Sequence, residues 1–302
     1  MLKVKLMNKI AKVGTDVLSA TKYELGADLI NEDAIMVRSA SLQELEFSPN
    51  LRAIARCGAG VNNIPVDRCT KNGIVVFNTP GANANAVKEL AIAALVLASR
   101  DIIGGVQWAK TLVGQENVAK AVEAGKSAFV GHELAGKTLG VIGLGAIGGM
   151  VANAAISLGM NVMGYDPYIT AKAAWSLAPS VRQASDYKEI FQNCDYISLH
   201  VPATPQTKNM INATTIAQMK DGVKFMNFSR DKLVNEADLL ADPEIDAVYI
   251  ASPVVFHAKQ AMAAADAGKH ILIEKPLAMT SEEGQKVVEY CESKGVKIAA
   301  GL

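Results

Sequence analysis

The chain has 302 residues, of which 50% are hydrophobic and 20% are charged, so it is long enough to bury the cores of two globular domains. Its 30 basic and 30 acidic residues balance to a formal net charge of +0, which argues against a nucleic-acid or anionic-membrane partner. The longest apolar run, residues 91–99, is too short to span a bilayer, and no basic-then-apolar signal segment opens the sequence. We therefore expect a cytoplasmic protein.

The four cysteines, Cys57, Cys69, Cys194 and Cys291, are scattered without any Cys-x-x-Cys pair. This spacing favours neither a disulfide framework nor a thiolate metal site, and no metal is expected. We expect reduced thiols, most of them packing residues.

Short β-rich runs alternate with helical patterns from residue 2 onward, which is typical of a small α/β domain with a parallel sheet. The expected strands are residues 2–6, 34–37, 53–56 and 75–78. Arg38, followed by Ser39, and Arg56 stand at the ends of two of these strands. Ligands of open parallel sheets gather at the carboxyl ends of strands, so these residues are candidates for binding an anionic substrate.

A glycine-rich loop, Gly58-Ala59-Gly60-Val61-Asn62, follows the second arginine. Exposed N–H groups in such a loop could hold a carboxylate. A flexible loop flanked by two solvated arginines is the alternative interpretation.

An apolar strand over residues 138–142 runs directly into a Gly-x-Gly-x-x-Gly turn formed by Gly143, Gly145 and Gly148. The first glycine permits a tight turn, the second lets backbone N–H groups approach a pyrophosphate, and the third lets the following helix pack closely. The phosphates are expected at the N-terminus of a helix over residues 147–158, with Ala146 and Ile147 among the cofactor contacts.

A second strand, residues 161–165, delivers Asp166 and Pro167 at its end, 23 positions after Gly143 in the case of the aspartate. A carboxylate there accepts hydrogen bonds from ribose hydroxyls and repels a 2′-phosphate, so it predicts NAD rather than NADP. An ordinary strand–helix–strand unit with a turn aspartate is the alternative.

Two further strands end in candidate site residues. Residues 196–199 lead into His200-Val201-Pro202, and residues 223–227, which end at Asn227, lead into Phe228-Ser229-Arg230. A guanidinium at this position can bind an anionic substrate group bidentately and polarise a nearby carbonyl. Arg230 is therefore the main catalytic candidate.

Three stretches, residues 56–64, 75–81 and 144–148, together resemble the D-2-hydroxyacid dehydrogenases, and within them the phosphoglycerate dehydrogenase group. The resemblance covers residues 1 to about 240. It implies a Rossmann-type doubly wound parallel sheet with a second, smaller flavodoxin-like α/β substrate domain. The implied boundaries are 1–83 for the substrate domain and 84–302 for the NAD-binding domain, with 84–100 as a linking helix.

The same resemblance implies hydride transfer between NAD and C2 of a 2-hydroxy acid such as 3-phosphoglycerate, the reaction class of serine biosynthesis. It implies a homodimer formed through residues 113–136, and it places the His200–Pro202 turn against the adenosine half of the cofactor rather than in a catalytic role. Asn227 and Ser229 become cofactor contacts, and Arg230 the residue that orients substrate. Asp231 departs from the family, which usually has glycine at that position.

Residues 241–302 follow a different pattern. With His257, Gly268-Lys269-His270 and Glu274-Lys275-Pro276, they resemble the nucleotide domain of the glucose-fructose/inositol dehydrogenase (Gfo/Idh/MocA) family. That resemblance implies a proton-transfer role for Lys275. Ser252 aligns with the aspartate that ends the corresponding strand of the first family near the nicotinamide amide, so it is a candidate cofactor contact that can hydrogen-bond without charge. The glutamate and histidine acid–base pair of the first family has no match, so Lys275 and His257 are the candidate substitutes. A packed or cofactor-contacting role is the favoured alternative for each, because a general base must first have the right geometry.

The two resemblances together indicate a composite chain. They suggest that strand 246–251 occupies the next position of the Rossmann sheet, and that strands 270–274 and 297–300, separated by helix 281–294, extend or cap that sheet. The leading functional hypothesis is an NAD-dependent D-2-hydroxyacid dehydrogenase with impaired turnover. The alternatives are an NAD-binding chimera without turnover and a sugar or polyol oxidoreductase of the second family.

Overall fold

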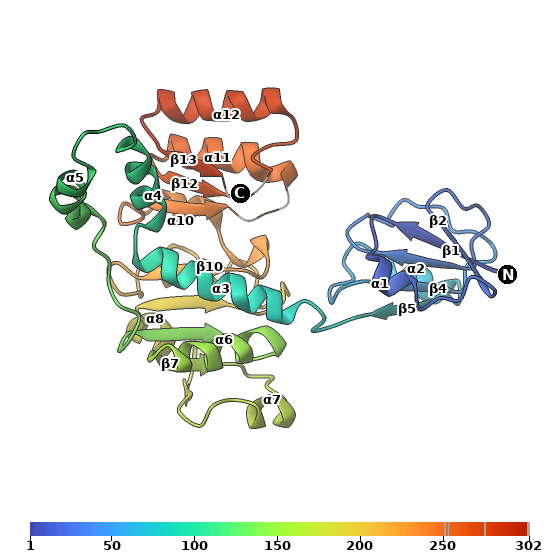
Figure 1. The fold of residues 1–302 in the computed structure, drawn as a ribbon. Helices are drawn as coiled ribbons and strands as arrows, with labels where there is room; N and C mark the ends of the chain where they lie inside the picture. Colours follow the sequence, from blue (N-terminus) through green and yellow to red (C-terminus); the bar gives the residue numbers. More distant parts are fainter. Residues whose placement is uncertain (251, 253, 275, 301–302) are drawn as a thin grey trace. The chain divides into compact units, whose positions relative to one another are not determined.

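The computed structural model describes residues 1–250, 252, 254–274 and 276–300. The chain divides into two compact units, Met1–Ala86 and Val87–Leu302 (Figure 1). The long helix α3 (Ala84–Ser99) begins in the first unit and continues into the second.

The first unit is built on a five-stranded parallel sheet in the order β2-β1-β3-β4-β5, the flavodoxin-like order. Its strands are β1 (Leu2–Met7), β2 (Tyr23–Gly26), β3 (Ala34–Val37), β4 (Ala53–Arg56) and β5 (Val75–Asn78). The fold class expected for this part is confirmed, although β2 carries no clear strand signal in the sequence.

The helices of this unit, over residues 1–86, are short: α1 (Lys12–Thr15) and α2 (Val66–Lys71) precede the long α3. The core combines alternating strand residues such as Ile35, Val37 and Ile54 with Cys69 from α2. On the edge strand β5, Phe77 remains 58% exposed. Because α1 and α2 are short, loops form much of the chain between the strands, and the conformation of these loops depends on side-chain hydrogen bonds.

The second unit continues with α4 (Ile102–Thr111), α5 (Val118–Gly125) and a short 3-10 helix η1 (Lys126–Phe129). The ring of Trp108 in α4 lies 5.1 Å from that of Phe129, centroid to centroid, and thereby ties η1 back to α4. The segment expected to take part in a dimer, residues 113–136, thus contains α5 and η1.

The Rossmann sheet of the second unit has five parallel strands in the order β10-β9-β6-β7-β8. Its elements are β6 (Thr138–Ile142), α6 (Ala146–Ser157), β7 (Asn161–Tyr165), α7 (Ala171–Trp175), β8 (Arg182–Gln183), α8 (Tyr187–Asn193), β9 (Tyr196–Leu199), α9 (Ala213–Ile216) and β10 (Lys224–Asn227). The strand order reverses at β6, which pairs with β7 on one side and β9 on the other. Ligands bind at such a switch point in open α/β sheets.

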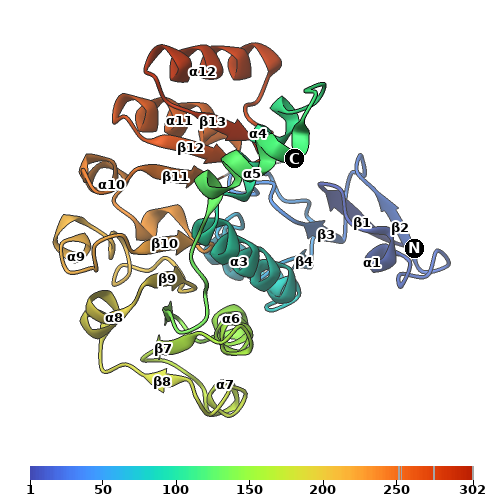
Figure 2. The ribbon, with the colours of Figure 1, turned by 60° about the vertical axis from the view of Figure 1, so that its left-hand side comes forward.

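Helices cover both faces of this sheet, and Figure 2 shows α6 and α8 on opposite sides. Val141 packs with Val151 and Ala155 of α6, whereas Ile142 packs with Ile190 of α8. Burial on both faces explains why these strands read as continuous apolar runs.

The last part of the chain corrects one expectation. After η2 (Asp231–Leu233) and α10 (Glu236–Ala241) come β11 (Ala247–Ile250), η3 (Val254–Phe256), α11 (His257–Asp266), β12 (His270–Ile273), α12 (Ser281–Ser293) and β13 (Ile298–Ala300). The prediction that β11 takes the sheet position after β10 is wrong. Among the described residues, β11 pairs with β12 and β12 with β13, and they form a separate three-stranded parallel sheet.

The separate sheet has a physical reason. Successive strand–helix–strand units place α11 and α12 on one face, where Ile250, Ile271 and Ile273 pack with Ala264 and Val287. The three strands thereby complete a core of their own without a ladder to β10. The link to the Rossmann sheet includes a ring contact, Phe228 to Tyr249, with centroids 6.4 Å apart.

Among the residues that the structure describes, none of the helices combines the length and apolarity needed to cross a bilayer. All four cysteines are free thiols, and Cys69, Cys194 and Cys291 are buried. Burial raises the pKa of the Cys194 thiol to about 12, which makes it an unreactive packing group.

Candidate functional site

The glycine turn joins β6 to α6 and has the geometry of a phosphate cradle. Gly143 has φ +92°, and a Cβ there would lie 2.8 Å from the His200 backbone. A Cβ on Gly148 would collide with the Gly143 carbonyl oxygen, whereas a Cβ on Gly145 would meet nothing within 4 Å. A glycine is therefore suited to each position for a different reason. Position 143 needs a positive φ and a close backbone contact, position 148 needs close packing, and position 145 leaves open space for a ligand.

The N-terminus of α6 presents uncapped donors beside this open space. No side chain caps Gly145, and within the described chain the N–H groups of Gly145, Ala146 and Ile147 donate to no protein acceptor. The positive end of a 12-residue helix with free N–H groups is suited to a pyrophosphate. The residues present therefore fit the phosphates of a dinucleotide.

Asp166 lies at the end of β7 and already braces the turn. Its Oδ2 accepts a hydrogen bond from the Leu144 N–H at 2.9 Å, and its Oδ1 accepts one from the Tyr168 N–H at 2.9 Å. Each carboxylate oxygen retains a further lone pair for a ribose hydroxyl. The bond to Leu144 is a role that sequence spacing did not reveal. Pro167 follows Asp166 directly.

The turn after β9 packs against the glycine turn. The His200 N–H donates to the Ile142 carbonyl at 2.7 Å, and Ser198 Oγ lies 2.9 Å from His200 Nε2. Thr207 Oγ1 donates to the Pro202 carbonyl at 2.7 Å, and Ser229 Oγ donates to the Val201 carbonyl at 2.5 Å. The ends of β6, β9 and β10 are thereby held together.

His200 Nδ1 is buried and has no hydrogen-bond partner among the described residues. Burial lowers the pKa of this imidazole from 6.5 to about 4, so the ring is neutral near pH 7. A buried, neutral imidazole is poorly placed to act as a general base, and the sequence resemblance implies a contact with the adenosine half of the cofactor instead.

The lowered pKa makes stability depend on pH. Because the unfolded histidine takes up a proton below about pH 6.5 and the folded one only near pH 4, stability is lost as pH falls through this range. We expect a loss of about 3 kcal/mol in the free energy of unfolding by pH 4, relative to a His200→Gln variant. Urea titrations across this range test the expectation, and parallel curves for parent and variant would contradict it.

Arg230 lies just beyond β10, exposed to solvent. Its turn is fixed by Asn227, whose Nδ2 donates to the Arg230 carbonyl at 2.7 Å and whose Oδ1 accepts the Ser229 N–H at 3.0 Å. Arg230 Nη1 donates to the Ser229 carbonyl at 2.8 Å, and its other donors have no acceptor among the described residues, so they can bind an anion. Among the described residues Asp231 forms no ion pair with it.

Of the two candidate substitutes for the acid–base pair, the structure describes only His257. Lys275 lies outside the described residues. His257 is 1% exposed, with Nδ1 2.8 Å from the Pro276 carbonyl and Nε2 2.7 Å from the Ser252 carbonyl. Because both ring nitrogens face carbonyl oxygens, the geometry favours bracing of two loops over proton transfer.

Ser252 is also engaged. Its Oγ donates to Gln260 Oε1 at 2.5 Å, and Gln260 Nε2 donates to Glu236 Oε1 at 2.6 Å. These two hydrogen bonds connect the region of Gfo/Idh/MocA resemblance to α10. Another pair not found from the sequence is Tyr249, whose phenol donates to Glu274 Oε1 at 2.5 Å.

In the first unit, the structure brings the two predicted anion-binding segments together at the ends of β3 and β4. Arg56 folds back, its Nη1 donating to the Cys57 carbonyl at 2.6 Å, and its buried Nε has no partner among the described residues. Gly58 has φ +154°, and a Cβ there would collide with this guanidinium. The N–H groups of residues 59–62, all described, donate to no protein acceptor and are free for a carboxylate or phosphate.

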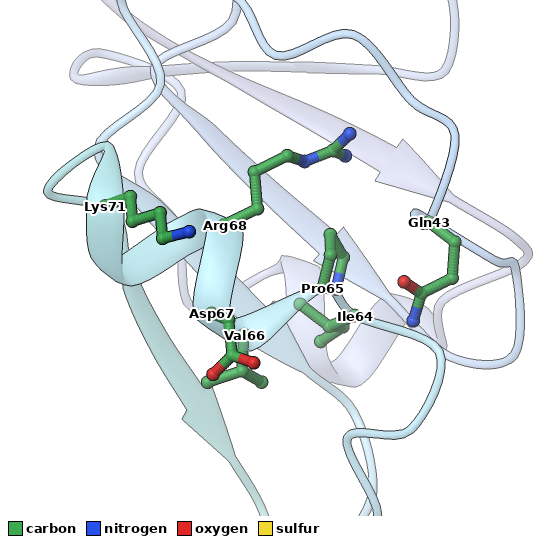
Figure 3. Close-up of a pocket in the computed structure, with 7 residues that line it drawn as sticks. All are labelled: Gln43, Ile64, Pro65, Val66, Asp67, Arg68 and Lys71. Atoms are coloured by element: carbon green, nitrogen blue, oxygen red, sulfur yellow. The ribbon is translucent and has the colours of Figure 1, made fainter.

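A hollow of about 650 Å³ lies beside this loop (Figure 3). It is lined by Gln43, Ile64, Pro65, Val66, Asp67, Arg68 and Lys71. The Arg68 guanidinium already has protein partners: its Nη2 donates to the Leu42 and Leu45 carbonyls, and its Cζ lies 4.3 Å from the Phe47 ring centroid. None of the lining residues belongs to the Gly58–Asn62 loop, so the hollow is distinct from the predicted anion loop.

Comparison with known families agrees with this geometry. The profile of the family described as D-isomer specific 2-hydroxyacid dehydrogenase, NAD binding domain, matches residues 98–257. A second profile, described as oxidoreductase family, NAD-binding Rossmann fold (Gfo/Idh/MocA), matches residues 214–302. The second match supports the composite character expected from the sequence, and the two matches overlap over residues 214–257.

Individual relatives point the same way. A D-3-phosphoglycerate dehydrogenase of Methanocaldococcus jannaschii is 37% identical over 239 residues, which are 78% of this chain and 43% of that protein. A hydroxypyruvate reductase of Thermotoga maritima is 39% identical over 78% of this chain and 72% of that protein. The chain spans 43% of the length of the first of these relatives and of a cyanobacterial D-3-phosphoglycerate dehydrogenase.

Solved structures share the fold. An NAD⁺-bound 3-phosphoglycerate dehydrogenase of Entamoeba histolytica superposes with a TM-score of 0.66 at 24% identity, covering 97% of this chain and 92% of that one. A D-lactate dehydrogenase of Escherichia coli gives 0.66 at 23% identity, with coverage of 97% and 94%. With a family profile over residues 98–257 and an uncapped glycine turn, the chain belongs to the D-isomer specific 2-hydroxyacid dehydrogenase family, and its cofactor is NAD.

Proposed function

We propose that the protein transfers hydride between NAD and C2 of a small, anionic 2-hydroxy acid, with 3-phosphoglycerate and 3-phosphohydroxypyruvate as the leading substrate pair. The observation that carries the proposal is the exposed Arg230 guanidinium at the carboxyl end of β10, in the same parallel sheet as the glycine turn. Bound NAD supplies the hydride acceptor, and Arg230 supplies the positive charge for a carboxylate and the adjoining carbonyl.

The substrate class is supported by the first unit and by the relatives. Arg38, Arg56 and the free N–H groups of residues 59–62 offer positive charge and donors for a carboxylate or phosphate. One relative is named for 3-phosphoglycerate and another for hydroxypyruvate. A panel of 3-phosphohydroxypyruvate, hydroxypyruvate and pyruvate, followed through NADH absorbance, tests this choice. Preference for unphosphorylated pyruvate would contradict the proposed phosphate role.

Turnover is expected to be slow. A general base contributes typically 10²–10⁴-fold in rate, and His257, the described candidate, is buried with both ring nitrogens facing carbonyls. This observation also favours a second candidate function, an NAD-binding protein without turnover. Binding of NADH without any substrate-dependent oxidation would support the second function over the first.

Cofactor preference should follow Asp166. Because its carboxylate repels a 2′-phosphate, we expect at least roughly tenfold tighter binding of NADH than of NADPH, about 1.4 kcal/mol. Asp166→Asn should reduce this preference, since an amide removes the charge while its oxygen can still accept the Leu144 N–H. Fluorescence titration measures both affinities, and equal binding of the two cofactors by the parent would refute the expectation.

A homodimer is proposed through α4 and α5. Apolar side chains project into solvent there, including Ile102 at 43%, Val106 at 51% and Val118 at 42% exposure. Exposed apolar residues on adjacent helices are typical of a protein interface. Light scattering at micromolar concentration should give a dimer mass for the parent and a monomer mass for Val106→Glu. A monomeric parent would contradict the proposal.

A further inference from the structure

The loop after β3 is held by an asparagine from a different strand end. Asn8, just after β1, has φ +74°, and its Oδ1 accepts three successive backbone N–H groups. The N···O distances are 3.2 Å for Arg38, 3.0 Å for Ser39 and 2.9 Å for Ala40. Successive N–H groups that converge in this way form a concavity suited to an acceptor of partial negative charge, and the Asn8 amide oxygen fills it.

The carbonyl groups of the same loop are held from the other side. Asn63, which directly follows the Gly58–Asn62 loop, donates through Nδ2 to the Ala40 carbonyl at 2.8 Å and to the Arg38 carbonyl at 3.3 Å. The anion loop after β4 is thus tied to Arg38 and Ser39 by a single side-chain amide. Two asparagines form a clamp on residues 38–40.

Among the described residues, Asn8 and Asn63 supply every protein hydrogen bond of the backbone of residues 38–40. The position of the exposed Arg38 side chain therefore depends on Asn8 and Asn63 rather than on helix or sheet ladders. Small displacements of a substrate-binding group cost affinity out of proportion to their effect on stability.

We infer that Asn8 and Asn63 are positioning residues, which set Arg38 and Ser39 in the orientation that receives the anionic group of the substrate. This inference rests on the proposed function, since it gives the clamp its substrate. The loop itself is solvent-exposed, so water can replace the lost hydrogen bonds and the fold should survive loss of either clamp residue.

The test uses Asn8→Gly, because glycine keeps the positive φ without strain and deletes only the acceptor. Asn31→Gly is the matched control: it also has positive φ, at 57°, and its side chain makes no hydrogen bond to the described residues. Asn8→Asp is the rescue variant, since aspartate tolerates this conformation and its carboxylate accepts the same N–H groups.

We expect Asn8→Gly to raise KM for 3-phosphohydroxypyruvate at least roughly tenfold, with kcat changed less than about threefold and NADH affinity unchanged. Asn31→Gly should leave all three quantities at parent values. Hydrogen exchange of the Ser39 and Ala40 amides should accelerate in Asn8→Gly and stay slow in Asn8→Asp and Asn31→Gly.

The outcomes separate the inference from the proposed function. A parent that oxidises NADH, with an Asn8→Gly variant of unchanged KM, overturns the inference and leaves the function standing. A parent without substrate-dependent activity overturns the function, and exchange then decides the clamp: unchanged protection of Ser39 and Ala40 in Asn8→Gly overturns it, whereas lost protection supports it.

Discussion

Gly145→Asp is expected to abolish NADH binding while the chain stays folded. A Cβ at this position meets no atom within 4 Å, and the backbone φ of −70° suits any residue, so the fold has no reason to resist the change. The new carboxylate would stand at the uncapped N-terminus of α6, where the pyrophosphate is expected, and would repel it. The dissociation constant should rise at least roughly 100-fold, about 2.8 kcal/mol.

Two neighbouring glycines serve as controls. Gly149→Ala introduces a methyl group that meets Leu177 Cδ2 at an ordinary 3.5 Å, and it should retain NADH binding. Gly148→Ala should instead lower the melting temperature, because its Cβ collides with the Gly143 carbonyl. If Gly145→Asp binds NADH as well as the parent does, the glycine turn is not the pyrophosphate site.

Arg230→Ala is expected to remove substrate-dependent oxidation of NADH and to leave NADH affinity intact. The guanidinium is exposed, donates to the neighbouring Ser229 carbonyl, and keeps donors free for a carboxylate and a developing oxyanion. Loss of such a charge-assisted contact should lower kcat/KM by roughly 10²–10³-fold. Arg230→Lys should recover little of this, because an ammonium lacks the planar fork. Steady-state kinetics with 3-phosphohydroxypyruvate measure the effect.

Lys232→Ala is the matched control for charge, since this exposed cation lies two positions further along the chain. It should leave kcat/KM within about twofold of the parent. If the two alanine variants lose activity equally, the effect is one of net charge and not of a specific clamp at Arg230.

The sequence was most informative where one residue type has one physical use. Gly143 and Gly148 could be predicted because a positive φ and a close backbone approach both exclude a Cβ, and the structure has both. The strands of the Rossmann sheet could be predicted because burial on both faces leaves continuous apolar runs. Strand β2 could not, since Tyr23–Gly26 is half-exposed and short.

Hydrogen bonds between distant segments were beyond the reach of sequence spacing. Asn8 and the loop at residues 38–40 are about thirty positions apart, and no periodicity connects them. The same holds for Asp166, whose bond to the Leu144 N–H appears only once β6 and β7 pair. An asparagine directly after a strand was the available signal for Asn8, because asparagine tolerates positive φ.

The end of the chain shows how a correct pattern gave an incorrect pairing. Strands β11, β12 and β13 lie close to where their β-rich runs predict, but which strand β11 joins depends on where its apolar face is buried. Ile250 packs with Ile271, Ile273 and α11, so β11 joins β12 rather than β10. The sequence contains the strands and the helices, whereas the choice of neighbour depends on packing.

The most direct test of the proposed function is a single-turnover experiment, in which stoichiometric NADH is bound to the protein and mixed with excess 3-phosphohydroxypyruvate. We predict that one equivalent of NADH is oxidised, at a rate well below the roughly 10 s⁻¹ typical of enzymes, and that Arg230→Ala suppresses this oxidation. The proposed function would be contradicted if bound NADH persisted unchanged over hours in the parent, or if parent and Arg230→Ala oxidised it at the same rate.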